Sequence, residues 1–325
     1  MKRYSLSRIA LFEYFSTILL IIHISIVDGR DHLHKSLPVF FCMIILLISC
    51  EKTNNPHSFQ GAKQEKNVWN ILIIGSDSRG EREARADTIM IAQYNKKENT
   101  AKLASIMRDS YVEIPSYDKK YNKINAAYYY GGPELLRQTI QHNFGINVSH
   151  YITIDFKAFV KIVDTIAPEG IKVNVTQTII DDMGLSLQPG LQALHGKDLL
   201  KYARFRHDTE SDFGRVKRQQ EVLQALKHTL TNKVHSMDGV LSLPSMAHEL
   251  SPYVKTNLDI GALFTIGNHM LFQPITTMET MRIPIDKEYE SALIPHAGSV
   301  LKINQEANAE AIQNFFNVTK AVNHP

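Results

Sequence analysis

The chain has 325 residues, 36 lysines and arginines against 33 aspartates and glutamates, and 44% hydrophobic residues, which excludes a disordered or fibrous protein. The formal net charge of +3 disfavours a pervasively basic surface that coats nucleic acid, although a local basic patch is compatible with it. Both cysteines, Cys42 and Cys50, lie near the N-terminus, so the rest of the chain can form neither disulfides nor cysteine-ligated metal sites.

Residues 1–50 form an apolar leader with two hydrophobic segments, 9–27 and 37–49. Two spanning segments would return the domain to the cytoplasm, whereas a single one would export it. The second segment is shorter than the ~20 residues that cross a bilayer and suits a signal-peptide core. Its end, LISC, resembles the lipobox of bacterial lipoproteins, where the cysteine, here Cys50, is acylated. A plain membrane anchor is the alternative, and a translation start downstream of Met1, such as at Val27, would explain the double segment.

Residues 51–67 are polar and lack an apolar period, which predicts a linker between the leader and a domain spanning 68–325. The domain opens with the continuous apolar run 68–74, which is typical of a strand buried on both faces. Residues 88–94 and 102–107 predict two further strands joined by a polar turn.

Residues 133–144 predict a helix, with Pro133 at its first position and Gly145 just past its end. The next predicted elements are a strand near 151–154, a helix at 156–165, a strand at 171–175, and helices at 198–204 and 216–234. This order predicts an α/β fold with a mixed central β-sheet flanked by helices. From about residue 245 the pattern is weak, with short signals at 256–258 and 307–316.

A basic motif precedes and opens the helix at 216–234. Arg215, Arg218 and Gln219 lie three or four residues apart on the same helical stripe as the apolar Val222, so all three are expected to face inward, toward a pocket. Cations near a helix N-terminus oppose the macrodipole unless an anion offsets them, and Asp212, the expected N-cap, supplies one charge. With Arg204 and Arg206, the guanidinium groups suit phosphate oxygens. A solvated basic face paired with Asp208 and Glu210 is the alternative.

Two carboxylates, Asp77 and Asp87, lie at strand ends on either side of one loop, with Arg85 beside them and Arg108 ending the third strand. Such carboxylates can share a hard divalent cation, which suits Mg²⁺ (or Mn²⁺). Strand-end loops are the usual ligand sites of open α/β sheets. Alternatively, Asp77 makes a local turn bond and Asp87 ends a strand without binding anything.

Several common catalytic motifs are absent from the sequence. It contains no Walker loop, GxGxxG, GxSxG or HExxH pattern, so ATPases, dinucleotide enzymes, serine esterases and zincins lack support. Isolated histidines such as His195 and His207 are better explained as structural or surface groups.

The motifs, taken in order, resemble the LytR–CpsA–Psr family of cell-wall glycopolymer ligases over about half the chain. The matching stretches are NILIIGSDSR (70–79), RADTIMI (85–91), SIMRD (105–109), KINAAYYYGG (123–132), GLQALHGKDLLKYARFRH (190–207) and DFGRVKRQ (212–219). One departure is Met107, which stands where the family usually has proline and restores a backbone donor before Arg108.

The resemblance implies an extracytoplasmic enzyme at the cell membrane. Such enzymes transfer a glycopolymer, such as teichoic acid or a capsule precursor, with its linking phosphate from a polyprenyl pyrophosphate carrier to peptidoglycan. The family's metal and catalytic carboxylates match Asp77 and Asp87. Its pyrophosphate-binding residues match Arg108, Arg204, Arg206, Arg215, Arg218, Gln219 and, more loosely, Arg85, where Arg79 or Arg82 are alternatives. We expect an apolar tunnel for the lipid near Phe156, Phe159 and Val222.

Two other functions compete with the enzyme. One is an envelope-associated regulator, because basic residues gather at 201–218; the near-neutral domain and the lack of a helix-turn-helix pattern argue against nucleic acid as a partner. The other is a protein that binds lipid pyrophosphates without transferring them. Catalytic turnover separates both from the transferase.

Overall fold

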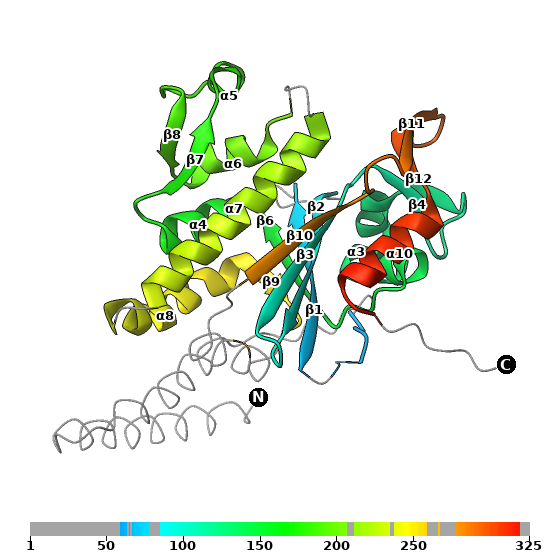
Figure 1. Cartoon of the computed structure of the whole chain (residues 1–325), viewed down its shortest axis with the longest axis horizontal. Helices are drawn as coiled ribbons and strands as arrows, with labels where there is room; N and C mark the ends of the chain where they lie inside the picture. The colour runs from blue at the N-terminus through cyan, green and yellow to red at the C-terminus, as the bar shows by residue number, and fades with distance from the viewer. Residues whose placement is uncertain are drawn as a thin grey trace, which may run out of the picture.

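A mixed six-stranded sheet forms the centre of the computed structural model (Figure 1). The structure describes residues 59–63, 65, 67–77, 85–206, 211–234, 237–258, 266 and 277–318. The predicted leader with Cys50, and most of the polar linker, lie outside these residues. Within the described ranges, no helix combines the length and the apolar character that crossing a membrane requires.

The central sheet contains all three of the first predicted strands. In spatial order its strands are β10 (Thr277–Ile283), β3 (Thr100–Ile106), β2 (Ala86–Asn95), β1 (Val68–Ser76), β6 (His150–Asp155) and β9 (Val254–Thr256). β1 pairs antiparallel with β2 and parallel with β6. The sheet is therefore mixed, as predicted, and the strands nearest its centre are the most apolar in the sequence.

Two smaller sheets flank the central one. The first has the order β11 (Tyr289–Ile294), β12 (Gly298–Ile303), β4 (Ser110–Glu113) and β5 (Tyr121–Lys123). The second is the pair β7 (Ile171–Val175) and β8 (Gly190–Leu194). Strand β4 begins four residues after β3 ends, so Arg108 and Asp109 lie in the short connection between two sheets.

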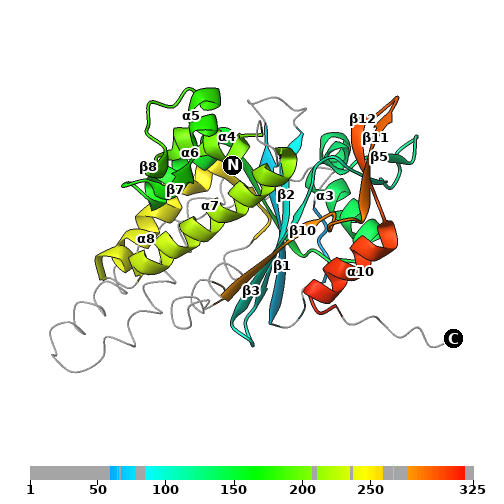
Figure 2. The same ribbon diagram turned by 45° about the horizontal axis from the view of Figure 1, so that its top comes forward.

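Helices cover both faces of the central sheet, as the two ribbon views show (Figures 1 and 2). One face carries α3 (Ile124–Phe144) and α10 (Gln305–Phe315). The other carries α4 (Phe156–Ile166), α6 (Gly196–Arg204), α7 (Ser211–Val234) and α8 (Met237–Leu250), with α5 (Gln177–Met183) beside β7 and η1 (Ser251–Tyr253) after α8. The predicted layered α/β fold is confirmed.

Helix α3 extends further toward the N-terminus than the sequence pattern predicts. Gly131 and Gly132 depart from helical geometry, and a straight helical segment begins at Pro133, as predicted. Gly145 ends it in the left-handed conformation, with φ of 69°. The residues before the kink form a first helical segment that the sequence analysis missed, because a Gly-Gly-Pro run normally marks a turn.

Strand β1 corrects one expectation about burial. Leu72, Ile74 and Ser76 are fully buried against α3, but Ile71 and Ile73 on the opposite face are only half-buried. The expectation that both faces are buried is wrong, because the helices on the side of Ile73 stand away from the sheet and leave a cavity.

The weakly patterned C-terminal part completes the fold. Strand β10 becomes an edge of the central sheet by pairing in parallel with β3. The backbone N–H of Met107 donates to the Ile283 carbonyl over 2.8 Å, a bond that proline at this position could not make. In α10, Ile312 joins the same core cluster as Phe144.

A buried ion pair within α3 also binds the backbone of the first described segment. Arg137 donates two hydrogen bonds to the Glu134 carboxylate, at 3.0 and 2.6 Å, and the Gln60 backbone N–H donates to the same group at 3.0 Å. Burial opposes ionisation of Glu134, but Arg137 and the Gln60 amide outweigh it and hold the pKa of Glu134 below its ordinary value. The carboxylate therefore stabilises the fold only while it is charged.

Replacing Glu134 by glutamine should lower the free energy of unfolding by about 3 kcal/mol, because it leaves the Arg137 charge buried without a counterion. Ionised Glu134 stabilises the protein above the ordinary glutamate pKa of about 4.3, and this contribution is lost as the pH falls through the lower folded pKa. Urea unfolding from pH 7 to pH 3 should thus show a weaker acid dependence for the variant. Glu310→Gln, on the exposed side of α10, is the matched control. Equal unfolding midpoints for both variants would contradict this role.

Candidate active site

A cavity of about 390 Å³ lies between α4, α6 and α7 and the facing side of the central sheet. Its wall is mainly apolar and includes Ile73 of β1, Phe156 and Phe159 of α4, and Val222 of α7. The volume falls within the range of about 300–1,000 Å³ that is usual for small-molecule sites. The expectation that Phe156, Phe159 and Val222 line an apolar cavity is confirmed.

The same cavity wall carries an excess of positive charge. Five cationic side chains and two carboxylates line it: Arg108, Lys201, Arg204, Arg206, Arg215, Asp87 and Asp155. Asp155 is also engaged elsewhere, because it caps α4 by accepting the Ala158 backbone N–H over 2.8 Å. Cations beside an apolar wall are costly to hold together without an anion. The cavity therefore suits a ligand with an anionic head and an apolar body.

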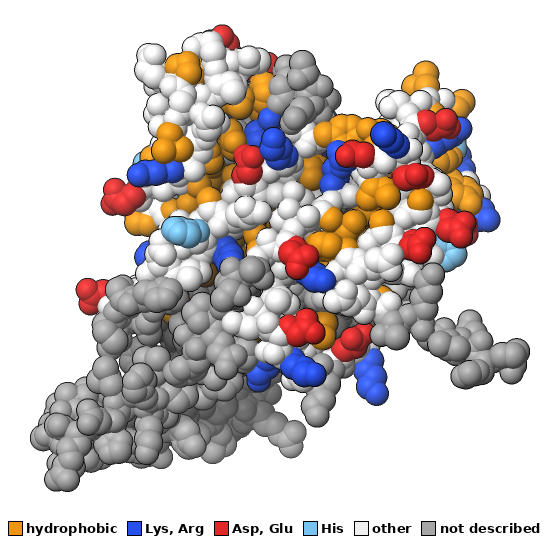
Figure 3. All heavy atoms as spheres, in the orientation of Figure 1, with side chains coloured by type: hydrophobic (Ala, Val, Ile, Leu, Met, Phe, Trp, Pro, Cys, Tyr) orange, Lys and Arg blue, Asp and Glu red, His pale blue; other side chains and the backbone are white. Residues whose placement is uncertain are grey.

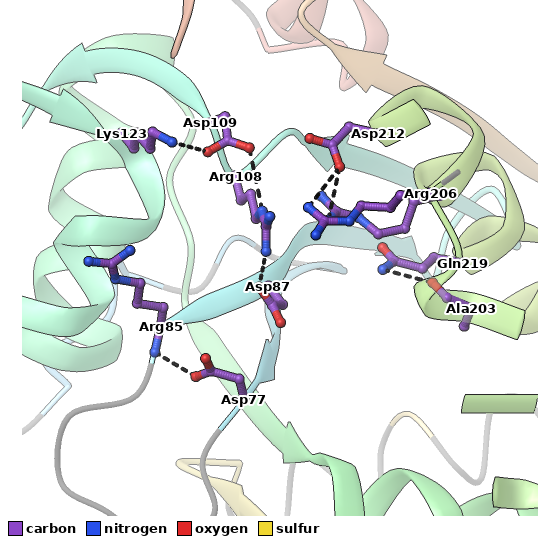
Figure 4. Close-up of polar contacts among 11 residues, drawn as sticks. Asp77, Arg85, Asp87, Arg108, Asp109, Lys123, Ala203, Arg206, Asp212 and Gln219 are labelled. Atoms are coloured by element: carbon purple, nitrogen blue, oxygen red, sulfur yellow. Dashed lines mark hydrogen bonds and ion pairs between the residues drawn. The ribbon is translucent and has the colours of Figure 1, made fainter. Parts of the chain in front are cut away.

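Arg108 is the centre of an alternating chain of charges (Figure 4). Its guanidinium pairs with Asp87 through Nη1 and contacts Asp109 through Nε at 3.4 Å, while Lys123 Nζ contacts Asp109 at 2.7 Å. Burial alone would lower the pKa of Arg108, but the two carboxylates raise it. Burial also opposes ionisation of Asp109, yet Lys123 and Arg108 hold the pKa of Asp109 below its usual range. Arg108 and Asp109 are therefore both charged at neutral pH.

Asp212 holds a second pair of arginines at the start of α7. Its Oδ1 lies 3.0 Å from Arg215 Nη1 and 3.5 Å from Arg206 Nη1. Because α7 begins at Ser211, Asp212 belongs to the first helical turn, and its expected place as the N-cap is wrong. Its carboxylate instead pairs with Arg206, which follows α6 (Figure 4), and with Arg215 of α7, and both arginines line the cavity.

Arg215 is the most strongly perturbed cation of the site. Only 5% of the residue is exposed, and its buried Nε has no hydrogen-bond partner among the described residues. Burial, together with the charge of Arg108, lowers the pKa of Arg215 to about 10, although Asp212 partly compensates. An anion in the cavity would relieve both the unpaired donor and the repulsion between guanidinium groups.

The remaining polar residues are positioned by packing between helices. The Arg204 guanidinium lies 4.3 Å from the centre of the Phe156 ring, a cation–π contact between α6 and α4. Gln219 donates from Nε2 to the Ala203 carbonyl at 3.4 Å and so joins α7 to α6. Both residues line the cavity.

A bulge where β2 begins directs the Asp87 side chain toward Arg108. Gly75 pairs with Thr88 and Ser76 with Ala86, so Asp87 is the extra residue of the bulge. A Cβ on Gly75 would lie 2.8 Å from the Thr88 Cβ, so glycine is required for this close approach. Asp77 comes directly after Ser76, the last residue of β1, and its Oδ1 accepts a hydrogen bond from the Arg85 backbone N–H at 2.8 Å.

The structure brings together most of the site residues that the sequence predicts. Those that line the one cavity are Asp87, Arg108, Arg204, Arg206, Arg215 and Gln219. Asp77 and Arg85 lie beside it, at the neighbouring strand ends, with Arg85 6.0 Å from the Tyr129 ring. Arg79 and Arg82, the alternatives to Arg85, fall outside the described residues.

Arg218 is the exception, because it does not reach this cavity. It donates from Nη2 to the Phe205 carbonyl at 2.7 Å and stacks on the Phe205 ring, on the side of α7 that faces β7. Its position fits a support for α6 and α7. Arg215 and Arg218 are both more than nine-tenths buried, so a solvated basic helix face is wrong for them. Lys123 and Lys201 were not predicted as site residues, although Lys123 opens one of the matching sequence stretches.

Among the described residues, the side chains of the site could hold a metal ion only together with a bound ligand. Among them, no three histidine, cysteine, aspartate or glutamate side chains are grouped as metal ligands. Asp77 and Asp87 offer hard carboxylate oxygens on adjacent strand ends. Mg²⁺ is usually bound by one or two carboxylates together with substrate phosphates, so this donor set is suitable once a phosphate ligand is present.

Comparison with known proteins yields consistent matches. The LytR_cpsA_psr family model matches residues 48–313. Regulatory protein MsrR of Staphylococcus aureus (strain COL) is 40% identical over 259 residues, 80% of this chain and 77% of MsrR. TagU of Bacillus subtilis (strain 168), a polyisoprenyl-teichoic acid–peptidoglycan teichoic acid transferase, is 32% identical over 203 residues, 62% of this chain and 64% of TagU. YwtF (TagT), solved with bound octaprenyl pyrophosphate lipid, matches with a TM-score of 0.58 and 27% identity, covering 81% of this chain and 98% of TagT.

The close contact between Gly75 and Thr88 predicts that a side chain at position 75 lowers the stability of the fold. Gly75→Ala should lower the free energy of unfolding by about 1–3 kcal/mol, because the new Cβ overpacks against Thr88. Thr88→Gly removes the clashing atom, so the double variant should recover part of the loss in a double-mutant cycle of urea unfolding. Strictly additive effects would show that the two positions do not clash.

Proposed function

The chain belongs to the LytR–CpsA–Psr family, and on that premise we propose that it is a phosphotransferase of the cell wall. It transfers a phosphate-linked glycopolymer, of teichoic acid or capsule type, from a polyprenyl pyrophosphate carrier to peptidoglycan. TagU, which is named for this kind of transfer, and TagT, which was solved with octaprenyl pyrophosphate, support the proposal.

The observation that carries the proposal is the combination of an apolar cavity with a group of cations in its wall. A polyprenyl pyrophosphate has matching chemistry, because a long hydrocarbon chain ends in a strongly anionic diphosphate. The lipid contacts the wall formed by Phe156, Phe159 and Val222. The diphosphate contacts Arg108, Arg206 and Arg215, where Arg215 contributes its unpaired Nε.

The reaction exchanges one phosphorus–oxygen bond for another. The acceptor hydroxyl oxygen attacks the phosphorus that carries the glycopolymer, and a new P–O bond forms. The bond from that phosphorus to the bridging oxygen breaks, and polyprenyl monophosphate leaves. The hydroxyl proton goes to Asp77 or Asp87. Guanidinium groups neutralise the charge that spreads over the phosphate oxygens, so positioning and electrostatics supply most of the catalysis.

The same proposal includes Mg²⁺ or Mn²⁺ as a cofactor held by Asp77 and Asp87. When bound, the cation supplies further neutralisation of the diphosphate and stabilises the leaving oxygen. The pairing of Asp87 with Arg108 also holds this carboxylate at the strand end beside Asp77, where its oxygens are suitable ligands for a hard cation.

We place the enzyme at the cell membrane, with its catalytic domain on the extracytoplasmic face. The N-terminal segment, or a lipid on Cys50, provides the attachment. A lipid-linked donor and a peptidoglycan acceptor meet only at this face, which supports the assignment.

A second function has one observation in its favour, since the relative MsrR is named a regulatory protein. An envelope-associated regulator, or a protein that binds lipid pyrophosphates without transferring them, would use the same cavity. Turnover decides between these functions and the transferase, because neither alternative releases polyprenyl phosphate.

Arg206→Ala should reduce transfer by about 10²–10³-fold, the usual effect of removing one donor to a charged transition state. Arg204→Ala should behave similarly. The assay uses a purified lipid-linked donor and an uncrosslinked peptidoglycan acceptor, with urea unfolding to verify the fold. Lys197→Ala, an exposed lysine on α6, is the control and should retain activity. Wild-type turnover by both arginine variants would refute the assigned roles.

Metal dependence is tested by binding as well as by turnover. Removing divalent cations with EDTA should abolish transfer, and Mg²⁺ or Mn²⁺ should restore it. Calorimetry should show that Mg²⁺ strengthens octaprenyl pyrophosphate binding by the wild type but has no effect on binding by Asp77→Asn. Equal affinity for the lipid with and without Mg²⁺ in the wild type would exclude a metal shared between protein and diphosphate.

A further inference from the structure

A second groove runs along the opposite side of α7 from the cavity. It has a volume of about 630 Å³ and lies between the first half of α7 and the strands β10 and β11. Phe213, Val216 and Gln220 face this groove, whereas Arg215 and Gln219 face the cavity. Figure 3 shows apolar, cationic and acidic side chains gathered over the end of β10 and the neighbouring β11. The two sites are therefore separated only by the width of one helix.

Two half-buried aromatic rings and one arginine form the floor of the groove. The Phe213 ring lies 5.3 Å from the ring of Tyr289, and the Arg282 guanidinium lies 4.2 Å from the Phe213 ring centre. Neither ring belongs to the two main buried core clusters. Both rings line the groove, and the Arg282 guanidinium lies over the Phe213 ring.

The polar groups of the groove are held in fixed positions. Arg282 donates from Nε to the Pro284 carbonyl at 3.2 Å and also pairs with Asp286. Gln220 donates from Nε2 to Ser105 Oγ and to the Met281 carbonyl, both at 2.9 Å. Fixed polar groups lose little entropy on binding, which favours specific recognition. Asp286 and Lys217 are both exposed and line the groove.

Such a surface matches the chemistry of an oligosaccharide. A pyranose ring has an apolar face of C–H groups that can stack on an aromatic ring, and a rim of hydroxyls that needs charged or amide partners. The groove offers both, on an open and shallow surface that a long chain can cross. Lys217 would also attract carboxylates, which peptidoglycan carries on its muramic acid and stem peptides.

The connection to the catalytic cavity runs through the first turn of α7. Phe213 follows Asp212, whose carboxylate holds Arg206 and Arg215 in the cavity wall. The charge of Asp212 also contributes to raising the pKa of Arg108. Phe213 of the groove is thus the direct neighbour in sequence of the carboxylate that holds the guanidinium groups assigned to the diphosphate.

We propose that this groove, formed by Phe213, Gln220, Arg282, Asp286 and Tyr289, is the binding site for the acceptor glycan strand. The inference rests on the proposed transferase function, and it assigns donor and acceptor to opposite sides of α7. The lipid-linked donor occupies the cavity, the peptidoglycan strand occupies the groove, and the acceptor hydroxyl reaches the diphosphate around the N-terminal end of the helix.

The test measures binding and kinetics on the full chain in detergent. The binding probe is a soluble, uncrosslinked peptidoglycan oligosaccharide, followed by calorimetry. Tyr289→Ala should weaken its binding and raise the acceptor KM by about tenfold, roughly the loss of one aromatic contact. Affinity for octaprenyl pyrophosphate and the donor KM should not change. Tyr289→Phe keeps the ring and should rescue most of the effect, which a simple folding defect would not explain.

The matched control is Tyr253→Ala, an exposed tyrosine in η1 away from both sites. Unchanged oligosaccharide binding and acceptor KM in Tyr289→Ala would overturn the groove assignment while leaving the transferase intact. A wild type that binds the oligosaccharide, with binding lost in Tyr289→Ala, but never transfers a polymer would refute the transferase and retain the groove as a glycan site. A wild type that does not bind the oligosaccharide would overturn the inference.

Discussion

The charge balance around Arg108 and Arg215 constrains the architecture of the site. Several guanidinium groups lie along one apolar cavity, and only a few carboxylates offset them. Asp87 holds Arg108 from one strand end, and Asp212 holds Arg206 and Arg215 from the first turn of α7. Removing Asp212 would take away the carboxylate that pairs with the buried Arg215, and removing Asp87 would leave Arg108 with Asp109 alone, so the backbone must deliver both carboxylates to fixed places.

The backbone meets that requirement with local irregularities. The bulge that isolates Asp87 depends on Gly75, where a side chain would collide with Thr88. Helix α7 carries Asp212 and Arg215 one turn apart, so a single helical turn sets their contact. Gly75 and Asp87, where the pairing of β1 and β2 becomes irregular, both line the cavity. This is the pattern expected when a fold gives up ideal local geometry to position functional groups.

The sequence carries enough periodicity to predict the central strands and α7, but not the features that depend on distant contacts. Val222 and Arg215 share a helical stripe, and their common cavity follows from spacing alone. Arg218 lies three residues from Arg215, yet it turns to the Phe205 carbonyl on the other side, because helical spacing does not reveal which neighbouring helix offers an acceptor. Strand β10 was not predicted, since a short edge strand takes its conformation from pairing with β3 across a long stretch of chain.

The first described segment is part of the folded domain. Ala62 donates its backbone N–H to the Val148 carbonyl ahead of β6, and Gln60 donates to the Glu134 carboxylate of α3. The Phe59 ring lies 4.8 Å from the Tyr151 ring of β6. Releasing this segment would remove a donor from a buried carboxylate and uncover an aromatic ring, so residues ahead of β1 contribute to the stability of the sheet that carries the site.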